Sequence, residues 1–275
     1  MTILVTGARG HVGGQVLAQL LDAGEKVRAA SRDASTLDVP GGVETVSFDL
    51  ENPDVRALDG VRAVFLYTRP QGIEKFVDAA RRAGVEHVVQ LSSSATLEPN
   101  SENRIAVLHR AVEQVLAASG LAHTVLHPGH FASNTLGWAA EIADGVVRTP
   151  YPDARVGAIH EADIAAVAVR ALTTGGYRGA SLALTGPEPL SFREQATIIA
   201  DVLDRAVKLV ELSADEARER MAHQGLPDGA VDAILRSWAN ALDEPSPVTN
   251  TVEEVTGTAP RTFATWAWDN RARFS

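Results

Sequence analysis

The feature that most constrains this chain is a strand, a glycine turn and a helix within its first 20 residues. The apolar run Ile3–Val5 predicts a buried strand, and apolar residues then recur at helical spacing over 12–20. Gly7, Gly10 and Gly13 stand between these two patterns. Bare N–H groups at a helix N-terminus bind a dinucleotide pyrophosphate, and a Cβ on the turn would hold that anion away. The stretch therefore predicts a nucleotide-binding domain.

Each of the three glycines has its own expected task. Gly7 allows the sharp exit from the strand, Gly10 the close approach of phosphate, and Gly13 the packing of helix on strand. The GxxGxxG spacing is the variant found in proteins like the short-chain dehydrogenases/reductases. The alternative is that the glycines only punctuate a loop, but the strand before them and the helix after them favour the nucleotide site.

Alternating strand and helix patterns predict an α/β fold with a doubly wound parallel sheet, Rossmann-like in arrangement. We expect residues 1–185 to form the dinucleotide-binding domain and 186–275 a smaller α/β cap with a last helix over 262–273, while segments of 128–160 fit either part. The expected strands are 3–5, 26–30, 43–48, 61–67, 85–91, 123–126, 180–184 and 207–211. The other expected helices are 11–23, 72–83, 104–118, one that opens at 161, 191–203, 213–223 and 228–242.

Composition excludes several classes of function. The net charge is -10 and no basic patch is visible, so we expect neither nucleic acid nor a membrane surface as a partner. There are no cysteines, which excludes disulfides, thiolate nucleophiles and Cys-ligated metals. No apolar run approaches the roughly 20 residues of a membrane span. The expected location is cytoplasmic and the expected partner a small-molecule substrate, with monomer and homodimer both open.

The end of the second strand points to the cofactor. An Asp or Glu there would accept hydrogen bonds from the adenosine ribose, whereas this chain has Ser31 and Arg32. A guanidinium pairs with the 2′-phosphate of NADP, and Arg9 in the glycine turn reaches the same region. NADP(H) is therefore predicted over NAD(H). The alternative is that Arg32 is a solvated charge paired with Asp33.

Asp49 and Leu50 follow the third strand and suit the adenine, the carboxylate meeting the amino group and Leu50 packing on the ring. Asp49 equally suits a helix cap. The predicted set of cofactor-binding residues is Gly7, Arg9, Gly10, His11, Val12, Gly13, Ser31, Arg32, Asp49, Leu50, Tyr67, Thr68, Ser92, His109, Pro128 and Gly129.

Together these motifs resemble the NmrA-like, atypical short-chain dehydrogenase/reductase family, and within it the NADPH-dependent quinone oxidoreductases of the second type. The likeness spans nearly the whole chain, and it also rests on His127-Pro-Gly-x-Phe-x-x-x-Asn134, Leu184–Phe192, Gly225–Gly229 and Val252–Gly257. The resemblance implies a Rossmann domain, a small substrate domain and NADP(H). The family includes reductases of small molecules and also catalytically silent redox sensors.

The usual catalytic pair of short-chain dehydrogenases, Tyr-x-x-x-Lys, is missing. If His109 occupies the Lys position, Ile105 stands where the Tyr should be, and an isoleucine cannot transfer a proton. The catalytic acid is therefore unknown, with His109 and His127 as weak candidates against cofactor or core contacts. No histidine pair has metal-ligand spacing, so no metal is expected.

The loop after the sixth strand is expected to supply substrate contacts from His130, Phe131 and Asn134, although Asn134 suits a helix cap equally well. The leading hypothesis is an NADPH-dependent oxidoreductase that passes hydride to a small quinone-like, aromatic or carbonyl acceptor without the Tyr relay. The second is a non-catalytic NADP(H)-binding sensor or regulator.

Overall fold

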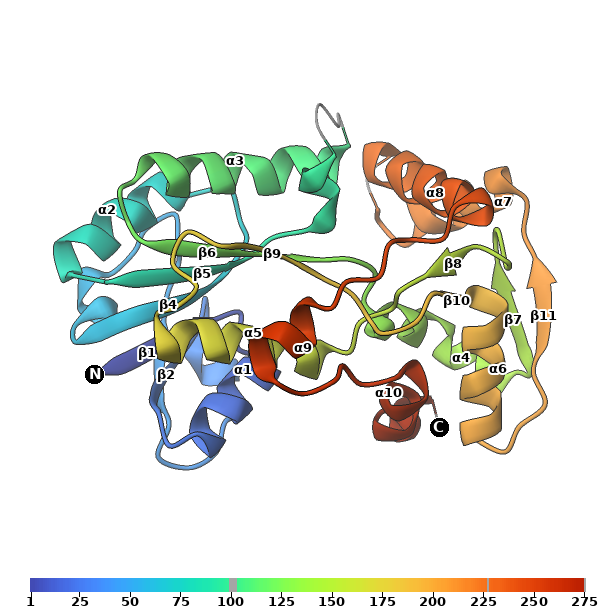
Figure 1. Cartoon of the computed structure of the whole chain (residues 1–275), viewed down its shortest axis with the longest axis horizontal. Helices are drawn as coiled ribbons and strands as arrows, with labels where there is room; N and C mark the ends of the chain where they lie inside the picture. Colours follow the sequence, from blue (N-terminus) through green and yellow to red (C-terminus); the bar gives the residue numbers. More distant parts are fainter. Residues whose placement is uncertain (99–102, 227, 275) are drawn as a thin grey trace. The chain divides into compact units, whose positions relative to one another are not determined.

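The computed structural model describes residues 1–98, 103–226 and 228–274, which form two compact units (Figure 1). Unit 1 comprises Met1–Pro128, Glu161–Leu184 and Glu254–Gly257, and unit 2 comprises Gly129–His160, Thr185–Glu253 and the chain from Thr258 onward. Pro227, in the turn of the 225–229 motif, lies outside the described residues.

Unit 1 is built on a parallel sheet of seven strands, which confirms the predicted doubly wound α/β fold. In sheet order the strands are β3 (Glu44–Ser47), β2 (Lys26–Ser31), β1 (Thr2–Thr6), β4 (Val61–Tyr67), β5 (His87–Leu91), β6 (His123–Pro128) and β9 (Ser181–Leu184). The strand order reverses between β1 and β4, and a crevice for ligands forms at the carboxyl ends of strands around such a point.

Helices cover both faces of this sheet, with α1 (His11–Asp22) and α5 (Glu161–Thr174) on one face and α2 (Ile73–Ala83) and α3 (Arg104–Ala118) on the other (Figure 1). The core between the sheet and the second pair of helices is a large apolar cluster. Its largest members include Phe76, Leu66 and Leu116, each with no exposed surface. This apolar layer fixes the strand ends from which the polar loops emerge.

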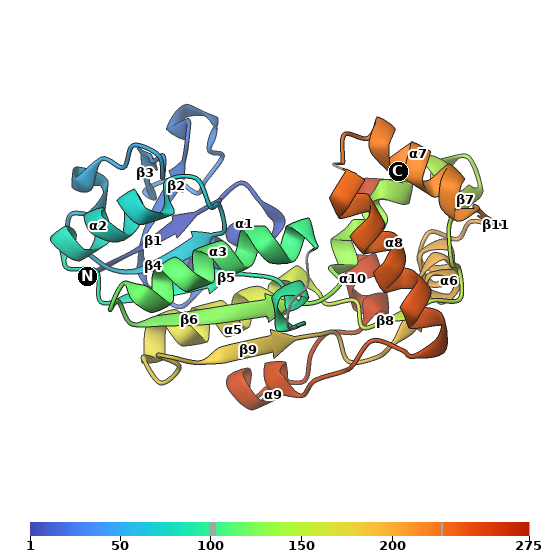
Figure 2. The same cartoon turned by 90° about the horizontal axis from the view of Figure 1, so that it is seen from above.

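Unit 2 is a mixture of short strands and helices (Figure 2). β8 (Arg155–Val156) pairs antiparallel with β10 (Leu190–Ser191), and β7 (Val146–Thr149) pairs parallel with β11 (Lys208–Glu211). Its helices are α4 (Ala139–Ala143), α6 (Phe192–Val202), α7 (Ala214–His223), α8 (Asp228–Asp243) and α10 (Phe263–Asp269), while α9 (Thr251–Thr256) has residues in both units. Short 3₁₀ turns are η1 (Ala34–Thr36), η2 (Val55–Leu58), η3 (Ser94–Leu97), η4 (Ala132–Trp138) and η5 (Arg271–Phe274).

Some predicted boundaries were wrong, among them the end of the sixth strand and the end of the last helix. The sixth strand was expected to end at 126, yet β6 continues to Pro128, which lies opposite Leu184 of β9. The last helix was expected to run over 262–273, but α10 ends at Asp269 and η5 follows. Asn270 ends the helix, since its side-chain amide donates to the carbonyl of Trp266 at 2.9 Å.

The glycine turn gives a direct test of the packing. A Cβ on Gly13 would lie 2.2 Å from the carbonyl oxygen of Gly7, whereas a Cβ on Gly14 would meet its nearest neighbour at 3.4 Å. We expect Gly13→Ala to lower the free energy of unfolding by about 2 kcal/mol. Gly14→Ala, in the same helix, should leave it unchanged or raise it by up to about 1 kcal/mol. Urea unfolding of both variants measures this, and equal effects would contradict the close approach.

Candidate functional site

The turn after β1 presents backbone rather than side chains at the start of α1. Gly7 has a φ of +65°, and the Gly10 N–H donates to the Gly7 carbonyl at 2.8 Å. Gly10 is the N-cap residue of α1 and supplies no side-chain acceptor to the first-turn N–H groups. These N–H groups and the helix dipole favour an anion. The turn therefore fits the pyrophosphate of a dinucleotide.

A cavity of about 450 Å³ opens beside this turn within unit 1. Eight of the residues predicted to bind the cofactor line it, from β2, β4 and the loops that follow β1, β2 and β3: Gly7, Arg9, Gly10, Ser31, Arg32, Asp49, Leu50 and Tyr67. Thr6, Ala30, Phe48 and Arg69 complete the lining. The cavity thus joins the glycine turn to the ends of the neighbouring strands, and the binding role of its residues stays a prediction.

Positive charge gathers at one side of this cavity. The carboxylate of Asp33 accepts hydrogen bonds from the backbone and hydroxyl of Ser35, which lower the pKa of Asp33. Arg32 has no ion pair or hydrogen bond with a side chain among the described residues, so the alternative pairing with Asp33 is not formed. Arg9 donates to the Thr36 hydroxyl at 3.0 Å. The guanidinium of Arg32 is available to a ligand.

The wall beyond β3 is formed by Asp49 and Leu50. Asp49 accepts the N–H of Glu51 at 3.1 Å, and the N-cap of η2 is Asp54, so Asp49 does not cap that helix. Leu50 is buried and Tyr67 is exposed. A carboxylate and an apolar side chain at this wall suit an adenine ring.

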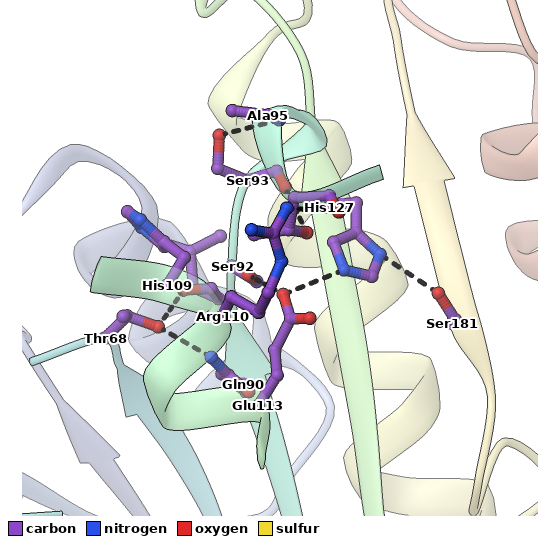
Figure 3. Close-up of polar contacts among 12 residues, drawn as sticks. Thr68, Gln90, Ser92, Ser93, Ala95, His109, Arg110, Glu113, His127 and Ser181 are labelled. Atoms are coloured by element: carbon purple, nitrogen blue, oxygen red, sulfur yellow. Dashed lines mark hydrogen bonds and ion pairs between the residues drawn. The ribbon is translucent and has the colours of Figure 1, made fainter. Parts of the chain in front are cut away.

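A second group of polar side chains lies at the carboxyl ends of β5 and β6 (Figure 3). Glu113 of α3 points toward Ser92 and His127, and its Oε1 accepts hydrogen bonds from the Ser92 hydroxyl and from Nε2 of His127, the latter at 3.0 Å. On the other side of the imidazole, Nδ1 of His127 lies 3.1 Å from the hydroxyl of Ser181 in β9. The result is a continuous chain, Ser92–Glu113–His127–Ser181.

The directions of the hydrogen bonds in this chain follow from its carboxylate. Burial alone would raise the pKa of Glu113, but hydrogen bonds from His127, Ser92 and Thr96 outweigh it and lower the pKa. An ionised carboxylate only accepts, so Ser92 and Nε2 of His127 donate to it. In the neutral ring, Nδ1 of His127 then accepts from Ser181. Ser92 has donated its proton and offers only lone pairs to a ligand.

His109 and Thr68 also donate their protons to groups of the protein itself. Nδ1 of His109 donates to the Ile105 carbonyl at 2.8 Å, and burial lowers the pKa of His109, so its Nε2 carries no proton in the neutral ring. The Thr68 hydroxyl donates to the Leu91 carbonyl and accepts from the Gln90 amide at 3.1 Å. His127 is 4 % exposed at its side chain. Neither histidine presents a proton at the surface of this site.

The remaining predicted residues lie in α1, at the end of β6 or in unit 2. His11, Val12 and Gly13 open α1 outside the cavity lining, Pro128 ends β6, and Gly129 begins unit 2.

The predicted substrate residues all lie in unit 2. His130 packs against Phe192 and Trp238, and desolvation lowers its pKa to about 4. Phe131 forms an isolated bridge with Ile159. Asn134 lies inside η4, where it caps neither η4 nor α4, and lines a cavity of about 140 Å³.

Several residues of the candidate site were not among those predicted from the sequence. Glu113 is one helical turn beyond His109, so the Ile105, His109, Glu113 spacing already placed it on the same face of the helix. Arg69 is adjacent to the predicted residue Thr68 in the sequence, and this position was the signal that could have identified it. Thr6 and Phe48 carried none, since a strand residue's side is not fixed by so short an apolar run.

Comparison with known proteins shows the class of protein. A family model described as NAD(P)H-binding matches residues 7–175, more than half of the chain, and the chain belongs to that family. It is 39% identical over 280 residues, with 99% of each sequence covered, to a (4-alkanoyl-5-oxo-2,5-dihydrofuran-3-yl)methyl phosphate reductase of Streptomyces griseus. It is 34% identical over 283 residues, again with 99% of each covered, to an NAD(P)H azoreductase of Xenophilus azovorans.

Among solved structures, an NADPH-dependent quinone oxidoreductase of a new type from Escherichia coli superposes with a TM-score of 0.80 at 24% identity, covering 97% of this chain and 98% of that one. At this identity the match shows a shared fold. The resemblance to NmrA-like proteins and to quinone oxidoreductases of the second type is confirmed. The chain is a member of a family of NAD(P)H-dependent oxidoreductases.

No helix in the described ranges is both long and apolar enough to cross a membrane. Within those same ranges, no three His, Asp or Glu side chains are grouped so as to hold a metal ion.

Replacing the shared carboxylate tests the hydrogen-bonded chain. At pH 7 we expect Glu113→Gln to lower the free energy of unfolding by roughly 1–3 kcal/mol, because a charged acceptor of several hydrogen bonds is lost. The pKa of Glu113 is lowered in the folded state, so its contribution is complete above pH 4.5 and disappears as pH falls through the folded value.

The difference between Glu113→Gln and wild type should therefore narrow below pH 4.5. Urea unfolding from pH 7 downward measures it. Asp78→Asn, which removes an exposed carboxylate of α2, is the control and should change little. A pH-independent loss would contradict the assigned charge.

Proposed function

We propose that the protein is an NADPH-dependent reductase of small, electron-poor acceptors, quinone-like or conjugated to a carbonyl, that works without the Tyr-x-x-x-Lys pair. The observation that carries this proposal is the cavity of unit 1, which combines the bare glycine turn with the guanidinium of Arg32, for which the described residues provide no side-chain partner. When bound there, NADPH supplies hydride.

The preference for NADPH is supported by charge. Arg32 and Arg9 line the cavity beside Ser31, and the position at the end of β2 holds no carboxylate to receive a ribose hydroxyl. A guanidinium binds a phosphate through charge-assisted hydrogen bonds. We assign the 2′-phosphate to Arg32 and Ser31, the pyrophosphate to the Gly7–Gly13 turn, and the adenine to Asp49 and Leu50.

The remaining predicted cofactor residues are proposed to hold the nicotinamide half. Ser92 offers a lone pair, because its proton goes to Glu113, and a lone pair suits the amide N–H of a carboxamide. Thr68, His109, Pro128 and Gly129 belong to the same half. We propose further that residues 186–275, with the part of 128–160 that belongs to unit 2, supply the acceptor-binding part.

The acceptor class is supported by the names of the relatives. The Streptomyces griseus enzyme is named for an unsaturated lactone whose ring double bond is conjugated to carbonyl groups, and the Xenophilus azovorans enzyme for an azo bond. Both have an electron-poor double bond that accepts a hydride at one end and a proton at the other. Water provides that proton, so a side-chain acid is not required.

Turnover tests this function. We expect purified protein to consume NADPH with a panel of naphthoquinones, azo dyes and a 4-alkanoyl butenolide bearing either a hydroxymethyl or a phosphoryloxymethyl group. Gly10→Asp is the control, because its carboxylate would face the pyrophosphate at the helix N-terminus and abolish turnover. If NADPH binds but no acceptor is reduced, the non-catalytic sensor becomes the better proposal.

Cofactor choice is tested at Arg32. We expect Arg32→Ala to weaken NADPH binding roughly 10- to 100-fold while NADH binding changes little, since one charge-assisted contact to the 2′-phosphate is lost. Calorimetric titration of both nucleotides measures the ratio. Arg81→Ala, which removes an exposed guanidinium from the last turn of α2, should leave both affinities unchanged. An unchanged NADPH-to-NADH ratio in Arg32→Ala would contradict the assignment.

A further inference from the structure

The cavity of about 140 Å³ lies wholly within unit 2 and is lined by cationic side chains. Arg148 comes from β7 and Arg220 from α7, and the described residues of the lining include no Asp or Glu. The whole chain carries a net charge of -10. The lining of this small cavity is therefore positively charged although the protein as a whole is negatively charged.

The two arginines share a single carboxylate, that of Glu141, which is not among the described residues of the cavity lining. Nη1 of Arg220 lies 2.7 Å and Nη1 of Arg148 3.6 Å from the same oxygen, Oε1 of Glu141, whose side chain is 14% exposed. The backbone N–H of Arg148 donates to the other oxygen at 3.1 Å. Glu141 thus fixes both guanidiniums and neutralises only one of them.

Hydrogen-bond donors remain after this pairing. Arg220 uses only Nη1, toward Glu141 and weakly toward the Arg148 carbonyl at 3.4 Å. The other donors of both guanidiniums have no partner among the described residues. Planar guanidinium donors of this kind match the oxygens of a phosphoryl or carboxylate group.

The same cavity also has aromatic side chains in its lining, in addition to the two arginines. Trp138 and Trp238 both line the cavity, and the Trp238 ring packs on Phe192 with centroids 4.9 Å apart. Asn134 adds an amide to the lining. Apolar walls with a few fixed polar groups are typical of small-molecule sites. The cavity therefore combines aromatic side chains that can contact a flat apolar ligand with guanidiniums that can bind an anionic group on that ligand.

We infer that this cavity binds the anionic group, phosphoryl or carboxylate, of the acceptor that the protein reduces. The inference rests on the proposed reductase function and narrows its substrate class to anionic conjugated molecules. Arg148 and Arg220 are the specificity-determining residues, and Glu141 is a positioning residue that holds both.

Matched acceptors separate this role from a structural one. The phosphoryloxymethyl butenolide and its hydroxymethyl counterpart differ only in the anionic group. We expect Arg148→Gln and Arg220→Gln each to lower kcat/KM for the phosphorylated acceptor roughly 10- to 100-fold, with less than about a threefold change for the neutral one. Arg148→Gln leaves the 2.7 Å Arg220–Glu141 pair in place, so it tests the inference even if Arg220→Gln is unstable.

Arg218→Gln is the matched control. Arg218 lies on α7, as Arg220 does, and it is not in the cavity lining. It pairs with Asp215 at 2.6 Å and with Asp232 at 3.2 Å. It should leave kcat/KM unchanged for both acceptors. Equal losses for the two acceptors, or no loss in the Arg148 and Arg220 variants, would overturn the inference.

Failure of the reductase function has a separate signature. If wild-type protein reduces neither butenolide, calorimetric titration with phenyl phosphate examines the cavity directly. Binding that is lost in Arg148→Gln and kept in Arg218→Gln supports the anion site while the reductase proposal fails. No binding of phenyl phosphate by the wild-type protein at millimolar concentration overturns the anion site itself.

Discussion

The close approach of α1 to the turn after β1 is the constraint on which unit 1 depends. A Cβ at Gly13 would lie 2.2 Å from the carbonyl oxygen of Gly7, so only a glycine allows α1 to pack this closely against the turn. A second close approach repeats this on the next wall, where a Cβ on Gly72 would lie 2.2 Å from the Leu50 carbonyl. Between the two approaches, the Thr6 hydroxyl joins β1 to β4 by donating to Phe65 and accepting from Tyr67. The cavity is the space that these contacts leave.

The surroundings of an arginine decide whether it stabilises the fold or serves a ligand. Arg28 in β2 is buried and donates to the carbonyls of Ala57 and Asp59 while it pairs with Glu44 at 2.9 Å. The guanidinium of Arg28 is thus paired within the fold. Arg32, just beyond the same strand, has no such partner in the part of the chain that the structure describes, and the neighbouring Asp33 accepts hydrogen bonds from Ser35 instead. Two arginines four residues apart therefore have opposite consequences, and residue type alone does not distinguish them.

Local patterns predicted several elements of both units well because each signal is contained in a few neighbouring residues. The helix 104–118 and the capping box of Ser191 and Glu194 are found as expected, since both depend on contacts within one or two turns. The bond between Ser92 and Glu113 joins residues that are 21 apart, and the bond between His127 and Ser181 joins residues that are 54 apart. Neither leaves a local trace. The extension of β6 to Pro128 has the same origin, because pairing with β9 overrides the turn tendency of the Pro-Gly pair.

The polar side chains near the ends of β5 and β6 donate their protons to other groups of the protein, and this limits the reactions that the proposed reductase can catalyse. Thr68 donates to Leu91, Ser92 and His127 donate to Glu113, and His109 donates to Ile105. Each of these four residues thus has its proton directed into the protein, leaving none of them to protonate an alkoxide as it forms. An isolated ketone needs such a proton, because an alkoxide is a strong base that water stabilises poorly. A quinone or a conjugated lactone does not, because hydride addition gives a delocalised phenolate or enolate that takes its proton from water afterward. The same hydrogen bonds that stabilise the strand ends therefore favour conjugated acceptors over simple carbonyl compounds.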